Sequence, residues 1–150
     1  MKIKWKLTII SVLLLIILVY IFLFQTEPAV TRLGQSFIDE VYKSFIEKGF
    51  VDFNEIADFE WERLLIVGPY SIVNRVLREE GLNWQRPVTH IESSDAITLL
   101  MFANKNNVVA FVHYPRGKGD FSQAVQGWAV FNRGEAKFTF ENGLERRINE

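Results

Sequence analysis

Cysteine is missing from this chain of 150 residues. Its absence excludes a disulfide framework, thiol catalysis, thiol redox chemistry and zinc sites built on cysteine. It also excludes lipid anchors that are attached to a cysteine side chain. Packing alone must therefore hold the folded part together, and thirteen Phe residues supply much of the apolar surface for it.

Histidine is almost missing, and familiar catalytic motifs are absent. His90 and His113 are the only histidines, and they lie in different segments without an H-x-x-x-H or H-E-x-x-H spacing. No G-x-S-x-G elbow, phosphate-binding loop or dinucleotide fingerprint occurs. The sequence therefore provides no catalytic residue, metal site or cofactor site, and it favours a protein without enzymatic activity.

An excess of positive charge is also missing, since the chain has 17 basic and 18 acidic residues. Without Lys2, Lys4 and Lys6 at its start, 14 basic residues face 18 acidic ones. A general nucleic-acid binder needs a basic face to neutralise phosphates. This composition argues against such a partner.

A long apolar run is present, over residues 7–24, with the sequence LTIISVLLLIILVYIFLF. As a helix it would be roughly 27 Å long, close to the ~30 Å core of a bilayer. This run predicts a single-pass cell membrane protein. Because lysines precede the run and none follows at once, the positive-inside rule places the N-terminus in the cytoplasm. Residues 1–6 would be cytoplasmic, 7–24 a signal anchor in the lipid bilayer, and 25–150 one domain outside. The alternative is a cleaved secretory signal, although no A-x-A-like site follows the run.

An amphipathic helix of about twenty residues is predicted after this run. Thr26-Glu27-Pro28 is typical of a helix start, and Gly49 of a helix end. Between them, apolar residues recur at spacings of three and four: Val30, Leu33, Phe37, Ile38, Val41, Tyr42, Phe45 and Ile46. The apolar stripe would pack on a sheet or, alternatively, pair with a helix of another membrane protein.

The rest of the chain predicts one short helix and several strands. Residues 59–67 favour a central strand, Gly68-Pro69-Tyr70 breaks it, and Ser71 would cap a helix that ends at Gly81. Residues 97–103 and 108–114 predict a hairpin, with Asn in the turn. Two further runs, 128–131 and 136–140, predict a second hairpin, which Asn142-Gly143 would end, with a frayed tail from Glu145. The fold class is therefore α+β, with an antiparallel sheet of about four to six strands.

Two segments carry a resemblance to a known group. Residues 59–71, FEWERLLIVGPYS, place a Trp at the start of a strand, followed by an apolar run and GPY. Residues 102–121, FANKNNVVAFVHYPRGKGDF, add a hairpin with a glycine-containing exit. Over residues 35–140 the chain resembles small membrane-anchored bacterial envelope proteins of unknown function. The resemblance implies a location in the cell envelope and no catalytic residues.

The most suggestive polar stretch is residues 113–120. Arg116 and Lys118 lie beside glycines, and such a loop can hold a carboxylate or phosphate, with His113 close by. Tyr70, at the strand-to-helix turn, is a further candidate ligand contact, although its ring can also simply pack while its hydroxyl meets the backbone. The alternative for the loop is a solvated connection after a hairpin.

Two functions remain after these exclusions. The first is a membrane-tethered, non-enzymatic interaction module that binds another envelope or membrane protein, a peptide or a wall component. The second is a domain that binds or hydrolyses a small anion or ligand through the 113–120 loop.

Overall fold

The structure is a computed structural model of the whole chain. It describes residues 2–23, 29–85, 87, 89–141 and 144–147, with side chains described at 10–20, 29–85, 87 and 89–139. The predicted helix start at Thr26–Pro28 and the predicted turn at Asn142-Gly143 lie outside the described residues.

The first helix, α1, comprises Lys2–Leu23. Its side chains are described over residues 10–20, which cover about 16 Å of helix against the ~30 Å core of a bilayer. Over the part of the chain that is described, no helix is both long enough and apolar enough to span a membrane. The predicted transmembrane segment at 7–24 is therefore wrong, and so is the single-pass localisation built on it.

The larger sheet has five strands, in the order β1-β5-β4-β3-β6. The bounds of these strands are β1 Thr31–Arg32, β3 Arg63–Val67, β4 Ile97–Asn104, β5 Asn107–Pro115 and β6 Trp128–Asn132. β3 lies between β4 and β6, so the predicted central strand is confirmed, although it begins at Arg63 and not at Phe59. β4 pairs with β5, which confirms the predicted first hairpin. β1 is the exception to the antiparallel pattern, because it runs parallel to β5.

The predicted amphipathic helix is shorter than expected. α2 comprises Gln35–Lys48 and ends at Gly49, whose left-handed backbone closes the helix as predicted. Thr31 and Arg32 instead form β1, and Gly34 is the N-cap. The physical reason is pairing with β5, which satisfies backbone groups that a longer helix would have used internally.

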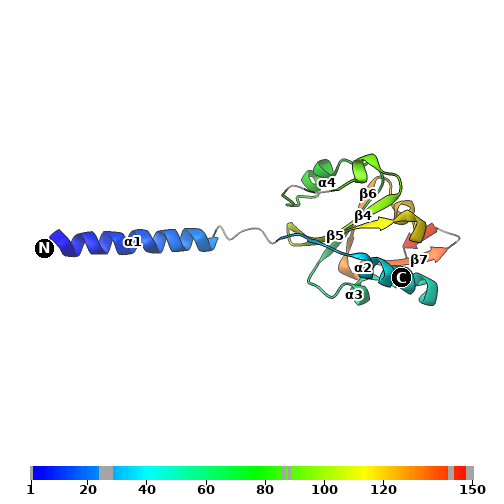
Figure 1. Cartoon of the computed structure of the whole chain (residues 1–150), viewed down its shortest axis with the longest axis horizontal. Coiled ribbons are helices and arrows are strands. Elements are labelled where there is room, and N and C mark those ends of the chain that lie inside the picture. The colour runs from blue at the N-terminus through cyan, green and yellow to red at the C-terminus, as the bar shows by residue number, and fades with distance from the viewer. Residues whose placement is uncertain (1, 24–28, 86, 88, 142–143, 148–150) are drawn as a thin grey trace.

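Helices cover the two faces of the large sheet. Figure 1 shows α2 and the short α3 (Phe53–Ile56) on one side, and α4 (Val73–Glu79) on the other. α4 buries Val73, Val76 and Leu77, but Ser71 does not cap it, because the N-cap is Ile72. The fold class α+β is thus confirmed for the described residues.

A second, three-stranded sheet has the order β2-β7-β8. Its strands are β2 Phe50–Asp52, β7 Lys137–Glu141 and β8 Leu144–Arg147. The predicted second hairpin is wrong, because β6 pairs with β3 whereas β7 pairs with β2 and β8. Between β6 and β7, the single turn η4 (Arg133–Glu135) carries a capping box that redirects the chain. The tail predicted to fray from Glu145 forms most of β8.

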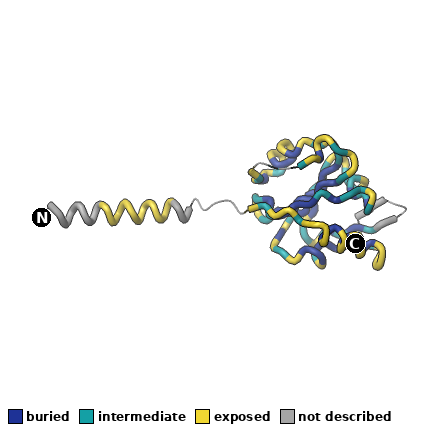
Figure 2. Tube along the Cα trace, viewed as in Figure 1, coloured by how far each residue is buried: buried dark blue, intermediate teal, exposed yellow. Residues whose placement is uncertain are grey.

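Burial follows the strands of the large sheet and the helix faces turned toward it (Figure 2). The core between this sheet, α2 and β7 is rich in phenylalanine, and several rings meet edge to face. Its phenylalanines are Phe37, Phe45, Phe53, Phe102, Phe121, Phe131 and Phe138. Ala110, Val112 and Tyr114 of β5 are buried in this core, and the polar features described next lie beside that strand or directly after it.

Candidate functional site

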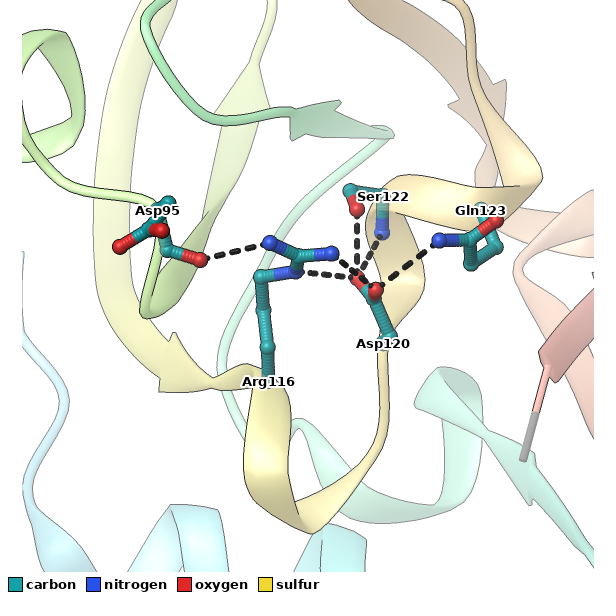
Figure 3. Close-up of polar contacts among 5 residues, drawn as sticks. All are labelled: Asp95, Arg116, Asp120, Ser122 and Gln123. Carbon is teal, nitrogen blue, oxygen red and sulfur yellow. Dashed lines mark hydrogen bonds and ion pairs between the residues drawn. The ribbon is translucent and has the colours of Figure 1, made fainter.

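Arg116 lies in η2 (Arg116–Lys118), directly after β5, and forms three polar contacts (Figure 3). Its Nε donates to Asp120 Oδ1 at 2.8 Å, and a terminal nitrogen donates to Asp120 Oδ2 at 2.5 Å. The other terminal nitrogen donates to the backbone oxygen of Asp95 at 2.6 Å. The guanidinium of Arg116 is therefore held on both sides by acceptors of the protein itself.

Asp120 is the centre of this network and the N-cap of η3 (Phe121–Ala124). Besides Arg116, its carboxylate accepts from the Ser122 backbone N–H at 3.1 Å, the Ser122 hydroxyl at 2.5 Å and the Gln123 side chain at 3.1 Å. Burial opposes its ionisation, but the hydrogen bonds from Arg116, Ser122 and Gln123 outweigh burial and lower its pKa to about 2. The carboxylate stays charged and paired across the neutral range.

Lys118 is paired in the same way, with an acid on α2. Its Nζ donates to Asp39 Oδ1 at 2.6 Å and lies 5.3 Å from the centre of the Tyr42 ring. The hydrogen bonds from Lys118 and from Gln35 lower the pKa of Asp39. An external anion at Arg116 or Lys118 would have to compete with an acid that each already holds.

Tyr70 has a strained backbone and an exposed side chain. Its φ is +62°, in the left-handed region that residues other than glycine rarely adopt, and its N–H donates to Ile91 O at 2.8 Å. The ring is 64% exposed, so it does not pack in the core. Whether it contacts a ligand stays a prediction.

His113 lies on β5 but belongs to different surroundings. Its Nε2 is 3.0 Å from the Thr89 hydroxyl, and its ring lies 5.9 Å from the ring of His90. Burial lowers its pKa first, followed by the positive charge of Arg32 and by His90. Among the described residues, His113 contacts Thr89, His90 and Phe111 and none of the other three candidates, whereas Tyr70 lies close enough to Arg116 to act on its pKa. The four predicted site residues therefore do not form one site in the described part of the chain.

A hollow of about 280 Å³ opens beside His113, between the edge of β5 and the start of α2. We call it the Arg32–His113 hollow. Its lining contains no acidic residue and consists of Arg32, Leu33, Gly34, Gln35, Ile38, Val112 and His113. Among the residues that the structure describes, none forms a hydrogen bond or ion pair with the Arg32 side chain. A positively charged side chain is thus available at this hollow.

The backbone around the hollow adds hydrogen-bond donors. Gly34 caps α2 without a side chain, so the first N–H groups of the helix have no side-chain acceptor. On the other side of the hollow, the N–H of Leu33 is already used, because it donates to Phe111 O at 2.8 Å. Because strand residues alternate in direction, His113 also points its N–H and C=O away from β4. The hollow therefore offers main-chain donors as well as Arg32.

Sequence reasoning selected His113 but missed Arg32 and Gly34. Both lie inside the predicted long helix and outside its apolar stripe. A signal was present, since glycine is unfavourable within a helix and common at its ends. Gly34 therefore could have marked the helix start, which would have released Thr31 and Arg32 to form a strand.

A second hollow, of about 410 Å³, lies beside α4, where Trp84 packs against Phe111 with ring centres 4.6 Å apart. Arg78 is the one charged residue in its lining. Within the described ranges, no three His, Asp or Glu side chains gather closely enough to hold a metal ion. The Arg32–His113 hollow is the stronger candidate site, because His113 and the first N–H groups of α2 lie beside its arginine.

Comparison with protein-family models, curated proteins and solved structures finds no match for this chain. The resemblance to bacterial envelope proteins therefore stays a prediction.

Proposed function

We propose that this protein is a non-enzymatic binding module that holds an anionic group of its ligand, a carboxylate or a phosphate, in the Arg32–His113 hollow. The observation that carries the proposal is the charge of the lining: Arg32 and His113 are present and no acid is. A guanidinium matches both anions, because it can donate two parallel hydrogen bonds.

The surrounding groups favour an anion over a cation. The N-terminus of α2 carries partial positive charge, and helix starts bind anions through free N–H groups. Burial, and after it the positive charge of Arg32, lower the pKa of His113 and so favour its neutral form. An anion would offset the positive charge of Arg32 and favour the protonated imidazole, which adds a second positive charge.

The lining also supports binding without catalysis. Covalent catalysis needs a nucleophile beside a base, and general acid–base catalysis by a carboxylate needs an Asp or Glu. His113 is the single lining residue of these kinds, and no described lining residue has a hydroxyl or carboxylate. The alternative, in which the 113–120 loop binds or hydrolyses a small ligand, stays a prediction that the internal ion pairs of that loop make less favourable.

An NMR titration of the isotopically labelled full chain with acetate and with inorganic phosphate tests the proposal. Amide shifts should concentrate at Gly34, Gln35 and His113, and Arg32→Gln should weaken binding about tenfold or more, as expected for a charge-assisted hydrogen bond. Arg75→Gln is the matched control, because Arg75 is exposed and paired with Glu79 on α4. Equal binding by the Arg32→Gln variant, or shifts confined to residues 116–123, would contradict the proposal.

A further inference from the structure

We infer that the natural occupant of the Arg32–His113 hollow is the free C-terminus of an extended peptide, which lies antiparallel to the outer edge of β5. This inference rests on the proposed function and adds the class of ligand to it. Two features carry it: an open strand edge that continues directly from the hollow, and a cluster of donors at one end of that edge.

The edge is open because β1 covers only part of β5. The two strands pair at Thr31 with Ala110 and at Arg32 with Phe111, and the last bond is that from Leu33 N–H to Phe111 O. Past this point the chain turns into α2, and within the described part of the protein no backbone hydrogen bond reaches the outward side of His113. A peptide residue can exchange two hydrogen bonds with His113 in the manner of an added strand.

The direction of the peptide follows from the charges. Arg32 and the start of α2 lie at the end of the open edge near Val112, whereas Pro115 lies at the other end. A carboxylate is favoured at the first end, so the peptide runs from Pro115 toward Val112, opposite to β5. Pro115 has no N–H, so the exchange of paired hydrogen bonds does not extend to it. The site therefore recognises only the last few residues of a chain.

The faces of β5 predict which last residue fits. If the penultimate peptide residue pairs with His113, its side chain lies on the side of Thr89 and His90. The last residue then lies opposite Val112, on the other face of the sheet, where Ile38 also lines the hollow. Both neighbours are aliphatic, so an aliphatic last residue such as valine or leucine is preferred over a charged one.

Fluorescence polarisation with labelled pentapeptides and the full chain tests this inference. The peptide Ala-Thr-Thr-Ala-Val with a free carboxylate should bind at least tenfold more tightly than its C-terminal amide, and than the same peptide ending in Asp or Lys. Methylation of the penultimate nitrogen removes the donor to His113 O and should also weaken binding about tenfold. Equal binding of acid and amide, or no effect of methylation, would overturn the inference.

Gly34 offers a pair of variants that separate binding from folding. A Cβ at Gly34 meets nothing within 4 Å, and its backbone is extended, so Asp and Asn both fit there as N-caps. Gly34→Asp should retain or raise the melting temperature and lose peptide binding at least tenfold, because its negative charge repels the peptide carboxylate from the same N–H groups. Gly34→Asn has the same shape without the charge and should bind at least threefold better than Gly34→Asp. Equal affinities of the two variants would contradict a site for a carboxylate.

The acetate titration distinguishes failure of this inference from failure of the proposed function. If acetate binds at the hollow but no pentapeptide binds more tightly than acetate, the peptide is wrong and the anion site stands. If inorganic phosphate binds more tightly than every peptide, a phosphorylated ligand replaces the peptide. If neither acetate nor phosphate nor any peptide binds at the hollow, the proposed function itself is wrong.

Discussion

Two arginines beside β5 have opposite surroundings: Arg32 lies opposite Phe111 in the middle of the strand, and Arg116 directly follows its last residue. Arg116 donates to both oxygens of Asp120, an acid of the same loop, so the charge of Arg116 is neutralised within the protein. Arg32 lines a hollow without an acidic residue, and no described residue pairs with its side chain. The comparison indicates that a positively charged side chain is a good candidate for ligand binding only when no acid of the protein already pairs with it. Arg116 and Lys118 pair with acids and have a structural role. Arg32, on the two-residue strand β1, can pair with a ligand.

The largest effect is expected from breaking the loop network. Asp120→Asn removes the charge that pairs with Arg116, and the side chain of Asp120 is only 15% exposed, so the free energy of unfolding should fall by about 2 kcal/mol. Chemical denaturation measures this change. Asp95→Asn is the control, because Arg116 uses the backbone oxygen of Asp95 and not its carboxylate. Equal losses in the two variants would contradict a specific role for the Asp120 carboxylate.

The same network should appear in the acid stability of the protein. The pKa of Asp120 is about 2 in the folded state against 3.8 for an ordinary Asp. Between these values the unfolded chain binds more protons, so stability is complete above about pH 4 and falls as the pH drops toward 2. Denaturation curves recorded from pH 5 to pH 2 should show this loss, and the Asp120→Asn variant should show a smaller one. Identical slopes would mean that other carboxylates dominate the acid transition.

The hollow should respond to pH near neutrality instead. Arg32 and His90 face His113, whose pKa lies below the ordinary 6.5, and a bound anion raises it. Acetate affinity should therefore rise about threefold between pH 7.5 and pH 5.5, because the complex takes up a proton. Calorimetric titration at the two pH values measures the change, and His113→Gln should abolish the pH dependence. An affinity that falls toward pH 5.5 would contradict the role assigned to His113.

The smallest change in stability is expected at Tyr70, which was predicted to contact a ligand but lies outside the lining of the hollow. Its φ of +62° is costly for any residue with a Cβ, so Tyr70→Gly should raise the free energy of unfolding by about 0.5–1 kcal/mol. Thermal denaturation measures this gain, and Tyr70→Phe, which keeps the strain, should leave stability unchanged. Acetate binding should be the same in all three proteins. Loss of acetate binding in both variants would instead indicate that Tyr70 contacts the ligand.

Local patterns predicted much of the fold, and long-range pairing explains what they missed. The hairpin of β4 and β5 and the central strand β3 follow from alternation and turn residues near one another in sequence. In the hairpin turn, Lys105 takes the left-handed conformation that was expected of asparagine, because Arg63 and Glu62 hydrogen-bond to its backbone. β1 was missed because its partner is far along the chain and its two residues carry no strand pattern of their own.

The candidate site was predicted only in part. His113 lines the hollow, and its role as a ligand contact stays a prediction. It was grouped with Arg116 and Lys118 because the three are neighbours in sequence. The spacing of Arg116 and Asp120 could have indicated an internal pair, whereas the bond from Lys118 to Asp39 on α2 needed the fold. The membrane assignment relied on the length and apolar composition of residues 7–24 and on the lysines before them, and it is the largest correction.

Anomalous diffraction from crystals of the full chain soaked in bromide tests the central claim most directly, because it locates bound anions without assuming a ligand. The account predicts a bromide peak in the Arg32–His113 hollow, against Arg32 and the first N–H groups of α2, and no peak at Arg116 or Lys118. A bromide at the 116–120 loop with none in the hollow would contradict it.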